Sequence, residues 1–140
     1  MSELTIGVIG TSRKTDERRY PIHPEHLLRI PENLRKQMVF EQGYGTAFNV
    51  SDEYIATLTG GIASRSEILT HIGTAIIAKP VLADLEEMRE GGTIWGYAHC
   101  VQQHEITQAA IERKLTLIAF EDMYVWSPNG NVGRHTFYKN

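Results

Sequence analysis

Short apolar segments of strand length alternate along this chain with segments of helical periodicity. The most apolar one, residues 74–78, is uninterrupted and ends at Lys79-Pro80, as expected for a strand buried on both faces of a parallel sheet. The predicted strands are residues 4–9, 38–42, 62–63, 74–78, 93–97 and 115–120. Helices are predicted over residues 24–34, 51–58, 81–89 and 105–114, with a short one after residue 64. The alternation predicts an α/β fold with a mostly parallel sheet flanked by helices.

Local signals predict where several of these elements begin and end. His23 precedes Pro24 as a helix cap, and Pro31 should bend or end the helix that starts there. Ser51 and Ser64 are predicted to cap the next two helices. Residues 127–131 should form a turn, after which the chain continues as a polar tail. No repeat or linker interrupts this pattern, and we expect residues 1–140 to form one domain.

Composition and charge narrow the classes of function. The 140 residues carry a formal net charge of -3, which argues against a nucleic-acid or membrane-surface protein. Seven of the 14 Lys and Arg residues nevertheless lie between residues 13 and 36, so a local anion site is possible there. We therefore expect neither a nucleic acid nor a membrane as a partner, and a homo-oligomer is compatible with the sequence.

The sequence also indicates a cellular compartment. Cys100 is the single cysteine, so an intramolecular disulfide is excluded, and the first residues lack the features of a secretory signal. No apolar run approaches the 18 or so residues of a membrane span. We expect a cytoplasmic protein, with Cys100 acting in packing rather than as a nucleophile.

Three of the predicted strands end at a side chain that could take part in chemistry. The first strand leads into a charged loop that ends at Arg19, the 74–78 strand ends at Lys79, and the 93–97 strand is followed by His99. Ligands of α/β sheets gather at the carboxyl ends of strands, so we expect the three to face one cleft.

Each of these residues also has an ordinary structural interpretation. The Arg19 guanidinium suits a carboxylate, but it could instead be solvated or pair with Asp16 or Glu17. Lys79 could be a common strand-end lysine. His99 suits proton transfer near neutral pH, but it could be a histidine of the core.

A metal site is not predicted. His23 with His26 and His99 with His104 have spacings that invite a metal hypothesis, such as a metal hydrolase. The chain has no second cysteine and no His-Glu-x-x-His motif, so we assign no metal ligand.

The glycines do not form a dinucleotide fingerprint. Gly7 and Gly10 supply half of the pattern, and Gly43-Tyr44-Gly45 lacks the third glycine. The expected fold is therefore Rossmann-like without its own fingerprint. If the protein uses a nicotinamide, the residues that bind this cofactor lie outside these 140 residues.

The order of motifs resembles the N-terminal domain of the alanine dehydrogenase and pyridine nucleotide transhydrogenase family. Arg19 lies five residues before Pro24, as does the family's substrate arginine before its first-helix proline, and residues 43–48 resemble the family's glycine turn. Lys79 with Pro80 resembles the strand-end lysine, and residues 97–100 resemble the segment that bears the catalytic histidine. The resemblance covers nearly the whole chain.

Within that family, residues 17–21 look closest to carboxyethylornithine synthase, and residues 98–100 resemble lysine-forming saccharopine dehydrogenase. The resemblance implies an NAD(P)-dependent oxidoreductase that reduces the imine formed from a 2-oxo acid and an amine. It makes Arg19 and Lys79 substrate-binding, and His99 and Lys79 catalytic. NAD or NADP would bind to another domain, in cis or as a separate subunit. The alternatives are an alanine or saccharopine dehydrogenase proper, or a non-catalytic acid-binding or regulatory domain.

Overall fold

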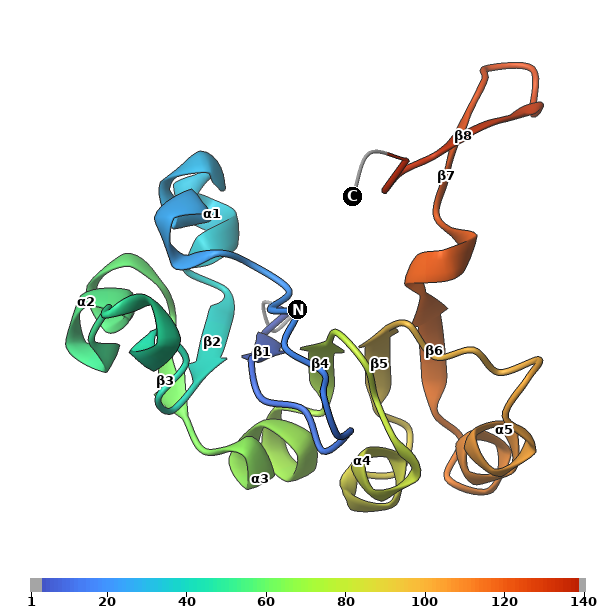
Figure 1. The fold of residues 1–140 in the computed structure, drawn as a ribbon, viewed down its shortest axis with the longest axis horizontal. Coiled ribbons are helices and arrows are strands. Elements are labelled where there is room, and N and C mark those ends of the chain that lie inside the picture. The colour runs from blue at the N-terminus through green and yellow to red at the C-terminus, as the bar shows by residue number, and fades with distance from the viewer. Residues whose placement is uncertain (1–3, 139–140) are drawn as a thin grey trace.

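A computed structural model describes residues 4–138, which build a six-stranded, fully parallel sheet (Figure 1). The strands, in chain order, are β1 Ile6–Ile9, β2 Met38–Glu41, β3 Gly61–Ala63, β4 Thr74–Ile77, β5 Thr93–Gly96 and β6 Thr116–Ala119. Their order in the sheet is β3-β2-β1-β4-β5-β6. The predicted α/β, Rossmann-like fold is confirmed.

The strand order reverses direction between β1 and β4. The chain runs outward from β1 through β2 to β3, returns to β4 beside β1, and then runs outward the other way to β6. At such a switch point, the loops that follow two adjacent strands run in opposite directions and leave a crevice between them. Ligands of open α/β sheets bind in this crevice, at the carboxyl ends of the strands.

Helices cover both faces of the sheet (Figure 1). One group is α1 Glu32–Arg35, α2 Asp52–Leu58 and the 3-10 helix Pro24–Arg29. The other group is α3 Arg65–Glu67, which continues as a π-helical turn Ile68–Ile72, with α4 Leu82–Glu87 and α5 His104–Glu112. Among the described residues no helix is long and apolar enough to cross a membrane.

Side chains that alternate along the central strands form two separate hydrophobic cores. Val8 of β1 and Ile76 of β4 pack in the core with Leu27 and Ile55. Their neighbours Ile9 and Ile77 pack in the other core, with residues of α4 and α5. Because successive strand residues point to opposite faces, an uninterrupted apolar strand such as β4 is required between two helical layers.

The predicted helix caps agree with the structure. The His23 side chain accepts a hydrogen bond from the backbone N–H of Glu25, and Pro24 is the first residue of the 3-10 helix. Pro31 divides the predicted helix into the 3-10 helix and α1. Ser51 and Ser64 cap α2 and α3, as predicted.

The last segment contains more regular structure than the sequence indicated. The predicted turn at residues 127–131 is present, but it joins β7 Tyr124–Trp126 to β8 Val132–His135 in an antiparallel hairpin. All three residues of β7 are exposed, so this strand lacks the alternation of buried and exposed side chains that identifies a strand from sequence.

Candidate functional site

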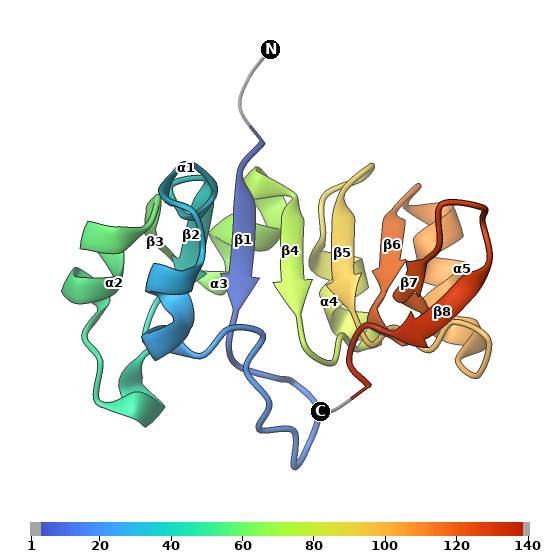
Figure 2. The same cartoon turned by 90° about the horizontal axis from the view of Figure 1, so that it is seen from above.

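The residues predicted to be functional lie along the carboxyl edge of the sheet. Strands β1, β4 and β5 are neighbours, and all their arrowheads point to the same side (Figure 2). Arg19 lies on the loop after β1, Lys79 shortly follows β4, and His99 lies just beyond β5. Parallel pairing of adjacent strands therefore brings these three chain segments to one edge.

The Arg19 guanidinium contacts a carboxylate along one edge and an aromatic ring on one face. Its Nε and Nη2 donate hydrogen bonds of 2.8 and 2.7 Å to the two carboxylate oxygens of Glu17. Its Cζ lies 4.9 Å from the centroid of the Tyr97 ring, within the range of a cation–π contact. Nη1 makes no hydrogen bond within residues 4–138, so the guanidinium is fixed while one donor group stays available to a ligand.

Glu17 should show the strength of this pairing in its titration. Hydrogen bonds from the Arg19 side chain are the largest cause that lowers the pKa of Glu17, from 4.5 to about 2. Because the folded-state pKa is depressed, the pair stabilises the loop above about pH 4.5 and loses this effect as the pH falls toward 2. We expect a carboxyl carbon NMR titration of Glu17 to have its midpoint near 2.

Two variants distinguish the effect of the Arg19–Glu17 pair on the Glu17 pKa from the effect of the other positive charges of the loop. In Arg19→Ala the Glu17 midpoint should return toward 4.5, whereas Arg18→Ala, which removes the neighbouring charge, should leave it near 2. A wild-type midpoint above 4, or no difference between the two variants, would contradict the pairing.

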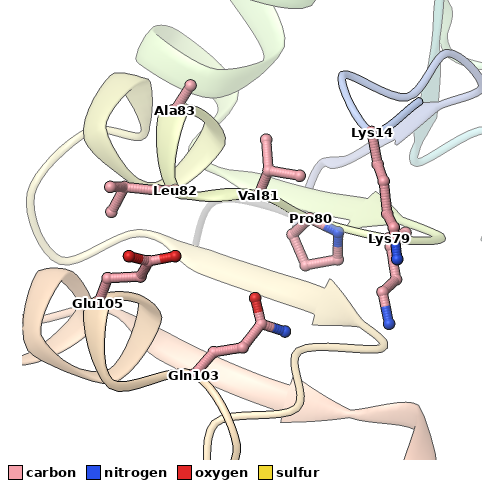
Figure 3. Close-up of a pocket in the computed structure, with 8 residues that line it drawn as sticks. All are labelled: Lys14, Lys79, Pro80, Val81, Leu82, Ala83, Gln103 and Glu105. Atoms are coloured by element: carbon pink, nitrogen blue, oxygen red, sulfur yellow. The ribbon is translucent and has the colours of Figure 1, made fainter.

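Lys79 is half-buried in a pocket of about 450 Å³ at the end of β4 (Figure 3). Burial lowers its pKa, and the nearby charges of Lys14 and Arg19 lower it further. An ammonium in such surroundings favours an anionic partner.

His99 has an unusual backbone conformation for a residue that is not glycine. Its φ is 48°, in the left-handed region, and its backbone N–H donates a hydrogen bond to Oε1 of Glu121. The imidazole Nδ1 lies 3.8 Å from the same oxygen, and the ring stacks on Tyr97 at a centroid distance of 6.1 Å. Strained backbone of this kind is often found at functional sites.

Tyr97 links two of the three predicted residues, since its ring contacts both the Arg19 guanidinium and the His99 imidazole. Arg19, Lys79 and His99 nevertheless line different pockets at the carboxyl edge of the sheet. Arg19 lines a cavity of about 190 Å³ with Tyr97, Lys79 lines the pocket described above, and His99 lines a pocket of about 380 Å³. The single cleft expected from the strand ends is therefore not observed, since the three pockets have no lining residue in common.

Glu17 was predicted only as an ordinary ion-pair partner of Arg19, and this pairing is present. Tyr97 and Glu121 were not predicted as members of this site. Glu121 follows β6, so the same strand-end rule that selected Lys79 and His99 would have found it. Its Oε2 is buried without a hydrogen-bond partner among the described residues. Tyr97 follows β5 directly, but no sequence signal indicated that its ring would contact Arg19.

The structure also bears on the remaining candidates. Burial, followed by the charge of Glu121, raises the pKa of the Cys100 thiol, which disfavours the thiolate that a nucleophile needs. Cys100 packs against the core between the sheet and helices α4 and α5, as expected of a packing residue. Within residues 4–138, no three His, Cys, Asp or Glu side chains form a group that could hold a metal ion.

The residues at the end of β1 do not fit the pyrophosphate of a dinucleotide. In a nucleotide-binding turn, backbone N–H groups after the first strand face the phosphates, and a helix starts directly there. Here the N–H groups of Gly10 and Thr11 donate to Oε2 of the buried Glu41 at 3.0 and 2.9 Å. The next helical segment begins only at Pro24. These two N–H groups are thus already paired with a carboxylate of the chain and are not free to bind a phosphate.

Comparisons with known proteins agree with this fold. Alanine dehydrogenase of Lysinibacillus sphaericus is 25% identical over 120 residues, which cover 85% of this chain and 32% of that protein. Alanine dehydrogenase of Methanococcus maripaludis is 26% identical over 87 residues, which cover 61% of this chain and 23% of that protein. The matched region therefore spans about a quarter to a third of these relatives.

Two solved structures have the same fold as this chain. One is an L-alanine dehydrogenase, with a TM-score of 0.69 and 21% identity, matched over 91% of this chain and 34% of that one. The other is a transhydrogenase from Sinorhizobium meliloti, with a TM-score of 0.69 and 16% identity, over 85% and 35%. The family model described as "Alanine dehydrogenase/PNT, N-terminal domain" matches residues 8–130. This chain therefore belongs to the family of alanine dehydrogenase and pyridine nucleotide transhydrogenase N-terminal domains.

Proposed function

We propose that this chain is the substrate-binding and catalytic N-terminal domain of an NAD(P)-dependent amino-acid or opine dehydrogenase. The observation that carries the proposal is Arg19, whose guanidinium is fixed by Glu17 and Tyr97 but keeps Nη1 available. It lies at the same sheet edge as Lys79 and His99. The reaction is the reduction of the imine that a 2-oxo acid and an amine form.

In the proposed mechanism, Arg19 binds the carboxylate of a 2-oxo acid such as pyruvate by a charge-assisted hydrogen bond. The Lys79 ammonium lies near the carboxyl group and the reacting carbonyl. Condensation with the amine forms a carbon–nitrogen bond and releases water, and His99 supplies the proton for the departing oxygen. The Glu121 carboxylate fixes the backbone at His99, and its Oε1 lies 3.8 Å from the imidazole Nδ1.

The cofactor belongs elsewhere in this proposal. The amide groups after β1 are already bound to Glu41, so we assign NAD or NADP to a separate nucleotide-binding domain, in cis or as another subunit. Residues 1–140 would then form a single substrate-side domain. Its own residues bind the acid, orient it and move a proton.

The finer assignment is a reaction like that of carboxyethylornithine synthase, in which the amine is an amino acid. The alternative is alanine dehydrogenase proper, in which the amine is ammonia. The curated relatives named above are alanine dehydrogenases, which favours the alternative. Residues 17–21 support the amino-acid reaction only through the resemblance described above.

The experiment measures NADH and NADPH oxidation by the complete enzyme, with this chain and its nucleotide-binding domain together. Pyruvate with L-ornithine or L-lysine should support oxidation, and pyruvate with ammonia should support it weakly. Equal or faster oxidation with ammonia would favour the alanine dehydrogenase alternative. If no 2-oxo acid and amine supported oxidation, the proposal of a dehydrogenase would fail.

A further inference from the structure

The pocket at Lys79 contains charged groups that the proposed chemistry does not use. Its walls are the start of α4, with Pro80, Val81 and Leu82, and the residues before and within the first turn of α5. With about 450 Å³ it is large enough for an amino acid. Its polar lining residues are Lys14, Lys79, Gln103 and Glu105.

Two ammonium groups share one side of this pocket. Lys14 and Lys79 both line the pocket, although they come from the loops after β1 and β4 (Figure 3). Within residues 4–138 neither ammonium forms an ion pair with a carboxylate. Burial and the charge of Lys14 lower the pKa of Lys79, as expected when two like charges line one pocket and repel each other. An anion between them would relieve this repulsion.

A negative charge lies on the opposite side. In Figure 3 the Glu105 carboxylate is separated from the two lysines, with Gln103 on the wall between them. Glu105 forms no ion pair within the described residues, and the side-chain oxygen of Gln103 accepts no hydrogen bond there. The pocket therefore offers a positive side, an amide and a negative side around an apolar wall.

We propose that this pocket binds the amino acid that donates the amine, with its carboxylate held by Lys14 and Lys79 and an ammonium group held by Glu105. A zwitterion matches both charged sides at once, which neither a simple anion nor a simple cation does. The amino-acid site itself is argued from the pocket, and only the statement that this amino acid donates the amine rests on the proposed function. It makes Lys14 and Glu105 determinants of substrate specificity.

The test is a titration of this chain with L-lysine, followed by backbone amide NMR. We expect shifts centred on residues 81–83 and 103–105. Lys14→Gln and Glu105→Gln should each weaken binding about threefold to tenfold. Lys114→Gln is the matched control and should leave binding unchanged. Lys114 is a highly exposed lysine that pairs with Glu90 and precedes β6, at the amino edge of the sheet.

Two further ligands test whether binding requires the carboxylate alone or the carboxylate together with an ammonium group. L-Lysinamide, which lacks the carboxylate, should bind more weakly than L-lysine to the wild type and be insensitive to Lys14→Gln. If acetate alone produced the same shifts with the same affinity as L-lysine, the pocket would be a simple anion site and the proposal would be wrong. Absence of L-lysine shifts in this pocket would also overturn it.

A parallel titration with pyruvate separates this inference from the proposed function. Pyruvate shifts near Arg19 and Tyr97 without L-lysine shifts in the pocket would overturn only the amino-acid subsite. L-Lysine binding in the pocket without any pyruvate shift near Arg19 would leave the subsite standing and contradict the proposed function.

Discussion

Replacing Asp84 with alanine is expected to lower the free energy of unfolding by about 3–5 kcal/mol. The side chain is fully buried and forms ion pairs with Arg65 at 2.6 Å and with Arg13 at 3.2 Å. Its second oxygen accepts a hydrogen bond from the backbone N–H of Val81 at the start of α4. The variant leaves two arginines without their shared carboxylate, and breaking a buried pair in this way is costly.

The network around Asp84 also connects the site to the fold. Arg65 donates to the backbone oxygen and the hydroxyl of Thr11, both at 3.0 Å, so it joins α3 to the loop that carries Arg19. Glu41 binds the other side of that loop through Gly10 and Thr11. Loss of Asp84 should therefore loosen the first part of this loop as well as α4.

Urea unfolding measures this effect, and Glu87→Ala is the control. Glu87 lies on the same helix and pairs with the same Arg13, but its side chain is partly exposed. Its removal should cost less than about 1 kcal/mol, as is usual for exposed pairs. If Asp84→Ala cost no more than Glu87→Ala, the buried network would not be the stabilising element that the structure indicates.

Replacing His99 with asparagine should lower the kcat of the complete enzyme by about a hundred- to ten-thousand-fold, the usual contribution of a general acid or base. Asparagine is chosen because the backbone at His99 has a φ of 48°, which asparagine tolerates better than most residues do. The loss can then be attributed to the imidazole rather than to a disturbed loop. KM for the 2-oxo acid should change much less than kcat, because the proposed mechanism assigns the carboxylate to Arg19 and not to His99.

The control for this prediction is His71→Asn. His71 is an exposed histidine in the helical turn before β4, near the amino edge of the sheet, away from the site. It should retain the activity of the unsubstituted enzyme. If His99→Asn retained full kcat while its unfolding midpoint was unchanged, His99 would have no catalytic role.

The sequence predicted those elements well in which a single physical requirement, such as burial on both faces, restricts the type of residue. A strand between two helical layers must be apolar on both faces, and β4 is identified by that requirement alone. Pro31 must interrupt a helix because it lacks an N–H, and the helix ends beside it. The hairpin of β7 and β8 was missed because its strands are largely exposed and leave no periodic pattern.

The candidate site was predictable only in part. Strand ends and their order indicate which loops meet, and this placed Arg19, Lys79 and His99 along one edge. Contacts between side chains of different loops have no periodicity to reveal them. The contact of Tyr97 with Arg19 and that of Glu121 with His99 depend on the paths of the loops, so only the structure shows them.

An NMR titration of this chain with pyruvate tests whether the carboxyl edge around Arg19 binds a 2-oxo acid. Shifts should cluster at Arg19, Lys79, Tyr97 and His99, and should be lost in Arg19→Met, a variant that keeps an apolar side chain of similar length. Exposed Arg29, on the 3-10 helix, provides the control variant Arg29→Met, in which the shifts should persist. Shifts that were absent, or that persisted unchanged in Arg19→Met, would contradict the assignment of this edge as the acid-binding site.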